Sequence, residues 1–193
     1  MDVKRSWQLT GLMLLFSSCV LAMHANTPSG WLLSGSKPND FTVEVDASHG
    51  YQGHASASLK CEHTSPDGFG TLMQSILADE YKGKKVRLSG FVKADDVTGW
   101  SGLWLRVDQG KDVVAFDNMQ SRPIKGTQTW QRYDVVLEVP AEATQISFGI
   151  LLNGAGKVSL SNTKFEAVGA DVPVTGFDPR KLLPKPVNLD FTE

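Results

Sequence analysis

The chain has 193 residues, of which 41% are hydrophobic and 21% charged, and its 19 Lys and Arg against 21 Asp and Glu give a formal net charge of −2. This apolar fraction supports a packed core and excludes a wholly disordered chain. The length suits a single domain. A slightly acidic chain has no net attraction to phosphates, so we expect no nucleic-acid binding. Its 2 cysteines exclude a disulfide-rich mini-fold and a four-thiolate zinc site.

The N-terminus is expected to be an export signal. Lys4 and Arg5 precede an apolar run over residues 9–21 that is too short for a membrane-spanning helix. Residues 1–25 therefore read as a signal peptide, and the protein is expected to be periplasmic or secreted, with no transmembrane segment. Three processing routes stay open: cleavage after Ala22, cleavage after Ala25, and a lipid anchor at Cys19 in Phe16-Ser17-Ser18-Cys19.

The following region predicts short strands joined by turns. Apolar and polar residues alternate with period two, and no stretch has a helical stripe of four turns. Turn dipeptides, among them Thr98-Gly99 and Lys125-Gly126, separate the runs, and 78–81 predicts at most one helical turn. The expected strands are 31–34, 41–45, 55–61, 69–77, 86–93, 103–107, 113–118, 133–139, 146–152 and 157–165. The predicted fold is an all-β antiparallel β-sandwich over residues 27–168.

Residues 169–193 predict an extended tail. This segment has four prolines, the first at Pro173 and the last at Pro186, and shows no alternation of apolar and polar residues. Prolines of this density stiffen a chain, so the tail is expected either to extend or to lie along the sandwich.

Several segments carry a resemblance to known proteins. Residues 29–31, 54–59, 86–93, 130–133 and 156–160 resemble the early and late strands of the galactose-binding-like jelly roll that many carbohydrate-binding modules use. More narrowly, three motifs resemble an uncharacterised bacterial group often labelled transcriptional regulators: Phe69-Gly70-Thr71-Leu72-Met73-Gln74-Ser75, Gly102-Leu103-Trp104-Leu105-Arg106-Val107-Asp108, and the segment from Phe116 to Ile124. The resemblance implies a jelly roll and a carbohydrate ligand.

Metal binding and catalysis are not expected. Where such jelly rolls often place an acidic pair that helps to hold calcium, this chain has Ser161-Asn162, so no calcium site is predicted. The spacing of His49, His54, Cys61 and His63 matches no zinc pattern, and Cys61 is expected to be a buried small hydrophobe. The adjacent acids Asp79-Glu80 and Asp95-Asp96 leave a small hydrolase as a third hypothesis.

A binding face is predicted around residue 104. Strand alternation places Trp100, Trp104 and Arg106 opposite the aliphatic set Leu103, Leu105 and Val107, so an outward indole could stack on a sugar ring. Further groups that could orient a ligand there are Gln74, Asn118, Gln120 and Arg122.

The purely structural alternative stays open for the same residues. In that interpretation a loop or the tail covers Trp104, and Arg106 forms an internal ion pair with Asp117. Trp31 and Trp130 are expected to pack in the core or at an edge. The sequence therefore predicts an exported, non-catalytic module that binds a carbohydrate or an envelope glycan, without a cofactor. The alternative is a protein-interaction or scaffold module of the bacterial envelope.

Overall fold

The computed structural model describes residues 27–63, 68–176, 186 and 189. The expected signal peptide, including Cys19, lies outside the described residues, as does most of the segment beyond Gly176. In the described chain two 3-10 turns, η1 (Pro38–Asp40) and η2 (Tyr51–Gly53), flank β2. The strands are β1 (Leu32–Gly35), β2 (Thr42–Asp46), β3 (Ser56–Cys61), β4 (Phe69–Leu77), β5 (Lys85–Gln109), β6 (Asp112–Asp117), β7 (Ile124–Glu138), β8 (Gln145–Asn153) and β9 (Gly156–Val168).

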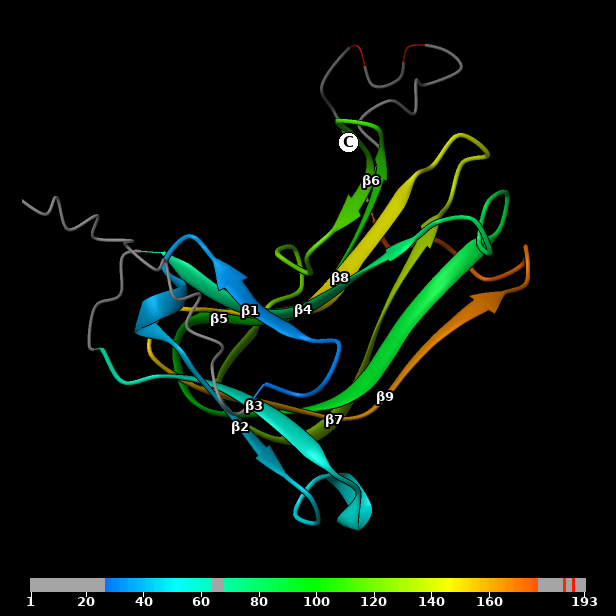
Figure 1. The fold of residues 1–193 in the computed structure, drawn as a ribbon. Helices are drawn as coiled ribbons and strands as arrows, with labels where there is room; N and C mark the ends of the chain where they lie inside the picture. Colours follow the sequence, from blue (N-terminus) through cyan, green and yellow to red (C-terminus); the bar gives the residue numbers. More distant parts are fainter. Residues whose placement is uncertain (1–26, 64–67, 177–185, 187–188, 190–193) are drawn as a thin grey trace, which may run out of the picture.

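Strand β5 belongs to two layers of antiparallel strands (Figure 1). Its C-terminal half pairs with β8, and the order continues through β4 to β1; we call this the β8 layer. Its N-terminal half pairs with β9, and the order continues through β3 to β2; we call this the β9 layer. β7 pairs with β5 beside the β9 layer, and β6 pairs with the C-terminal end of β5. The predicted antiparallel β-sandwich is confirmed.

The predicted turn at Thr98-Gly99 is wrong. Both residues lie within β5, which runs for 25 residues where the sequence predicted two separate strands. Register shifts against β7, the last between Val97 and Ser101, absorb the change of direction without ending the strand. A side chain at Gly99 would collide with the backbone of Asn153, so glycine here allows close passage of β5 past β8. At this position glycine marks a close approach between two strands and not a turn.

One smaller prediction also differs from the structure. Lys125-Gly126 lies inside β7, which begins at Ile124, nine residues earlier than the predicted strand at 133. Residues 78–81, for which the sequence predicted at most one helical turn, form a turn closed by the hydrogen bond that the Tyr81 amide donates to the Ala78 carbonyl (2.8 Å).

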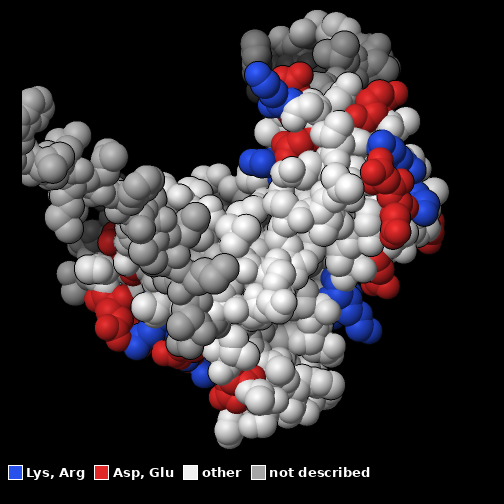
Figure 2. All heavy atoms as spheres, in the orientation of Figure 1, with Lys and Arg blue, Asp and Glu red and all other residues white. Residues whose placement is uncertain are grey.

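The hydrophobic core fills the space between the two layers. Leu88 and Val92 from β5, Leu59 from β3 and Leu103 from the second half of β5 are fully or almost fully buried there. Cys61 is 2% exposed in the same core, as expected of a lone thiol. Figure 2 shows charged side chains around the edge of one face and uncharged residues in its middle, where β4 and β8 lie in Figure 1.

The described part of the C-terminal segment lies along β7 and β5. The Thr175 amide donates to the Val136 carbonyl (2.9 Å), and the Val136 amide donates to the Thr175 hydroxyl (2.8 Å). The Lys85 ammonium donates to the carbonyls of Ala170 and Val172. No helix in the described residues is long and apolar enough to cross a membrane.

Candidate functional site

The predicted alternation around residue 104 is correct. Leu103, Leu105 and Val107 have no exposed surface and face the core. Trp104 and Arg106 therefore lie on the outer face of the β8 layer, together with the half-buried Trp100.

The expectation that Trp104 offers an open stacking surface is wrong. Its side chain is only 8% exposed, and the indole Nε1 donates to Thr71 Oγ1 on β4 at 2.7 Å. Trp104 lies in register with Gly149 of β8, where a side chain would collide with the backbone of Leu72 on β4, so β4 and β8 approach closely beside the indole. The hydrogen bond to Thr71 and this close strand packing hold the indole against β4.

The other residues of the predicted site do not converge on Trp104. Gln74 is in register with Phe148 and Leu105, which places it on the inner face of the β8 layer. Arg106 Nε donates to Asp108 Oδ2 (3.0 Å), so the alternative pairing with Asp117 is also wrong.

Residues 118–122 form a connection that is held by its own hydrogen bonds. The Asn118 side-chain oxygen accepts from the Gln120 amide (3.1 Å). Arg122 donates from both terminal guanidinium nitrogens to the buried Asp117 carboxylate, at 3.1 and 2.7 Å. These side chains shape the connection between β6 and β7 and do not join a common ligand site with Trp104.

A different site lies on the outer face of the β9 layer. It is a groove of about 530 Å³ whose floor is formed by small hydroxyl side chains. Ser58 of β3 lies in register with Ser159 of β9, and their hydroxyls are hydrogen-bonded at 2.8 Å. Ser56 extends the floor along β3. Small side chains on two central strands leave the hollow, because the flanking strands carry much longer ones.

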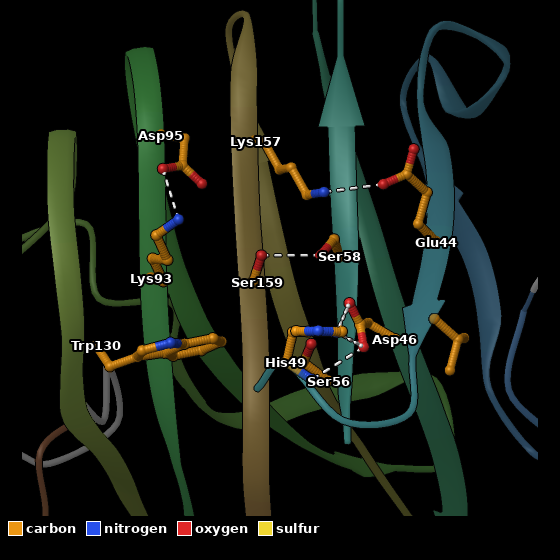
Figure 3. Close-up of a pocket in the computed structure, with 11 residues that line it drawn as sticks. Glu44, Asp46, His49, Ser56, Ser58, Lys93, Asp95, Trp130, Lys157 and Ser159 are labelled. Carbon is orange, nitrogen blue, oxygen red and sulfur yellow. Dashed lines mark hydrogen bonds and ion pairs between the residues drawn. The ribbon is translucent and has the colours of Figure 1, made fainter. Parts of the chain in front are cut away.

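Two rings line one end of this groove (Figure 3). The Trp130 side chain extends from β7 across β5. The His49 side chain comes from the β2–β3 connection and lies at the same position along the strands as Trp130. The His49 Nδ1 lies 2.9 and 3.0 Å from the two Asp46 carboxylate oxygens, which fixes the orientation of the ring. The His49 side chain is 82% exposed. The open face of an indole and an oriented imidazole therefore border the same hollow.

The charged side chains of the groove are paired with one another. Lys157 Nζ lies 2.8 Å from Glu44 Oε2, and Lys93 Nζ lies 3.0 Å from Asp95 Oδ1. The hydrogen bond from Lys157, with its charge, lowers the pKa of Glu44. The amide of Ser48, followed by His49, lowers the pKa of Asp46 to about 2. Both carboxylates are thus ionised at neutral pH and accept hydrogen bonds from hydroxyl groups.

The groove combines an aromatic plane with a dense set of hydrogen-bonding groups. This combination suits a polyhydroxylated ring, whose C–H face packs on an aromatic plane and whose hydroxyls bond to serines, ammonium groups and carboxylates. The sequence argument missed this site, because it assigned Trp130 to the core or an edge. A usable signal was present: Trp130 has the same strand parity as Arg132 and Asp134, which face away from the core.

The residues considered for metal or acid chemistry are engaged locally. Asp79 pairs with Lys82 (2.7 Å), and Asp96 Oδ1 accepts from the Thr127 hydroxyl (2.8 Å). His63 Nε2 lies 4.0 Å from Asp40 Oδ1. In the part of the chain that the structure describes, no three His, Cys, Asp or Glu side chains gather in a way that could hold a metal ion.

Comparison with known sequences gives one curated relative at high identity. The chain is 46% identical over 167 residues to the uncharacterized HTH-type transcriptional regulator YbfP of Bacillus subtilis (strain 168). The match covers 85% of this chain and 57% of the relative, so the chain spans little more than half of that protein's length. No family model matches the sequence. The predicted resemblance to a bacterial group labelled transcriptional regulators is confirmed.

Comparison with solved structures identifies jelly-roll proteins. One is the CBM22-1 xylan-binding domain from Paenibacillus barcinonensis Xyn10C, with a TM-score of 0.50 and 19% identity over 76% of this chain and 91% of that one. Another is the apo form of a cyclase from Fischerella sp., with a TM-score of 0.53 and 15% identity over 76% of this chain and 87% of that one. At this identity the likeness shows the fold alone. The fold is the predicted carbohydrate-binding-module-like jelly roll.

Proposed function

We propose that this protein is a non-catalytic glycan-binding module and that the groove on the β9 layer holds the sugar. The observation that carries the proposal is that the Trp130 ring lines the same groove as a floor of hydrogen-bonded serines. Its jelly-roll fold, which a xylan-binding domain also has, supports the same conclusion. The charged side chains of the groove are paired, so they suit hydroxyl groups better than a strongly charged ligand.

A binding role without catalysis is supported by how the polar groups are used. The Asp46 carboxylate accepts from the Ser48 and His49 amides as well as facing the imidazole, so its oxygens serve to shape the loop. Of the acid pairs considered for hydrolysis, Asp95 is paired with Lys93, and Asp96 is bound to Thr127. A general acid or base exchanges a proton with substrate, whereas these contacts engage the carboxylates of Asp46, Asp95 and Asp96 within the protein.

We also propose that the protein is exported and acts on glycans outside the cytoplasm. The basic residues Lys4 and Arg5 followed by the apolar run over 9–21 support this. Cell fractionation of the expressed full-length chain, with N-terminal sequencing of the mature form, tests it. Cleavage after Ala22 or Ala25 is the expected result, and full-length protein confined to the cytoplasm would contradict it.

Glycan binding is tested on Trp130. The full chain is titrated with xylan, β-1,4-galactan, mannan, cellulose fragments and peptidoglycan fragments, with intrinsic fluorescence and calorimetry as readouts. Covering about 50–100 Å² of one indole face at about 25 cal/mol per Å² contributes about 1–2.5 kcal/mol. Trp130→Ala should therefore weaken binding roughly five- to sixtyfold, whereas Trp100→Ala on the other layer should not. Equal effects of the two substitutions would refute the assignment of the groove.

The floor of the groove offers a second test with a matched control. Replacing both Ser58 and Ser159 by Val fills the hollow with methyl groups and removes both hydrogen-bonding partners together, which leaves no unpaired hydroxyl. The control replaces Ser75 and Ser147, an equivalent hydroxyl pair at 2.8 Å on β4 and β8. Only the first variant should lose glycan binding, while both stay folded. Glycan binding that survives the first change would remove the groove as the site.

A further inference from the structure

We propose that the groove binds the end of a glycan chain, not a stretch within it; this inference rests on the proposed function and specifies its ligand. The argument comes from the two ends of the groove. One end is closed by a fold of the protein's own chain, and the other is open.

The serine floor continues beyond the groove. Next to the pair of Ser58 and Ser159, Ser56 at the margin of the groove lies in register with Ser161 of β9, and Phe91 of β5 lies beside Ser161. If nothing covered this next row, the hollow would run on across the sheet, and a polysaccharide could pass through it. Ser161 is not part of the groove lining, and it is 2% exposed, against 6% for Ser58 and for Ser159.

The β2–β3 connection covers this row. The Tyr51 amide donates to Ser161 Oγ (3.1 Å), and Ser161 Oγ donates to the Ala55 carbonyl (2.8 Å). The Tyr51 ring stacks on Phe91, with ring centroids 3.5 Å apart and planes 7° from parallel. Gly50 sits so close to the Ser161 hydroxyl that a side chain there would collide with it. Backbone and aromatic contacts together wall off the groove just behind His49 and Trp130.

This wall is held at both of its ends. The Asp46 carboxylate accepts from the amides of Ser48 and His49 where the connection begins. The Gly50 amide donates to the His54 carbonyl (2.9 Å) where the connection returns to β3. Between them η2 packs against β5 through the Tyr51 ring. The wall is therefore a built part of the domain and not a swinging lid.

The opposite end of the groove is bordered by accessible polar side chains. Figure 3 shows the pairs Lys157–Glu44 and Lys93–Asp95 at the end away from Trp130 and His49. The side chains of Lys157 and Glu44 are 33% and 54% exposed. A bound chain leaves the groove in this direction. Its terminal sugar then lies against Trp130 and His49, with the next sugar between the two ion pairs.

The number of protein molecules bound per glycan chain tests this inference. Oligosaccharide ladders of two to six sugars from xylan, β-1,4-galactan and cellulose, and the parent polymers, are titrated calorimetrically with the full chain. End recognition predicts one binding site per glycan chain at every length. The amount of protein bound per gram of glycan is then inversely proportional to chain length. Several sites on each long chain would overturn the inference and leave the proposed function standing. A lack of binding to every glycan tested would overturn both.

A pair of variants tests the wall itself. Tyr51→Ala removes the ring stacked on Phe91, and it should raise the number of sites on a long chain above one. Gln52→Gly is the matched control, because Gln52 already has a left-handed φ of 51° that glycine accepts. The control should keep one site per chain. Tyr51→Ala with an unchanged single site on a long chain would show that Tyr51 does not close the groove.

Discussion

Removing the ion pair between Arg122 and Asp117 tests whether Arg122 has a structural role or a ligand-binding role. The Asp117 carboxylate is 7% exposed and accepts three hydrogen bonds, two from Arg122 and one from the Met119 amide (2.8 Å). Arg122→Ala leaves this buried charge with only the amide. Losing one partner of a fully buried pair costs about 3–5 kcal/mol, and an exposed pair is worth about 0–1 kcal/mol. Because the arginine side chain is 37% exposed, we expect a loss of about 2–3 kcal/mol.

Urea unfolding of the purified chain, followed by tryptophan fluorescence, measures this loss. The matched control is Arg132→Ala, whose guanidinium lies 3.9 Å from Asp134 with both side chains nearly half exposed, and which should cost less than about 1 kcal/mol. Combining Arg122→Ala with Asp117→Asn removes the orphaned charge, so the double variant should be more stable than the sum of the single losses. Equal losses for Arg122→Ala and Arg132→Ala would refute the reasoning. Glycan binding should be unchanged in Arg122→Ala.

Two further predictions concern Trp104 and Asp46. Trp104→Phe keeps one aromatic ring but removes the hydrogen bond to Thr71 and part of a buried side chain, so it should lower the free energy of unfolding by about 1–3 kcal/mol in urea melts. Glycan affinity should be unchanged, and weaker glycan binding would restore Trp104 as a ligand contact. Folding lowers the pKa of Asp46 from 3.8 to about 2, so its ionised form stabilises the native state above about pH 4, and this contribution is lost as the pH falls toward 2. Thermal melts of the wild type and Asp46→Asn should therefore converge between about pH 4 and pH 2, and a constant gap would contradict the assigned contacts.

The strand pattern was predictable because burial on one face imposes a period of two. The predicted run 69–77 coincides with β4, and the run 146–152 lies within β8. The single strand β5 was not predictable, because Thr98-Gly99 has the composition of a turn. Here the glycine serves close packing against Asn153, a tertiary contact that local sequence does not reveal. A turn dipeptide can adopt the backbone conformations of a turn, but tertiary contacts determine whether a turn forms.

The site was only partly predictable for a related reason. Strand parity correctly placed Trp104 away from the core, but leaving the core is not the same as reaching solvent. The indole is buried where it reaches Thr71 on β4, and this depends on which strands pair and in which register. No single-sequence pattern reports that register. The same limitation explains why Arg122 looked available although Asp117 binds it.

The groove follows from a pattern that parity alone could have exposed. Serine at two outward positions of β3 and at two of β9 would be a poor choice for a face that merely needs coverage, because β-branched and aromatic residues pack better on strands. Here the hydroxyls of Ser58 and Ser159 satisfy each other, and the Ser161 hydroxyl bonds to the Tyr51 amide and the Ala55 carbonyl, so small side chains line the face without an unpaired buried hydroxyl. The large side chains of this layer lie at its margin: Trp130 on β7, and the stacked rings of Tyr51 and Phe91 behind it. A floor of small side chains between large ones leaves room for a ligand but adds little packing to the fold. For this reason the binding role is assigned to the β9 layer and not to Trp104.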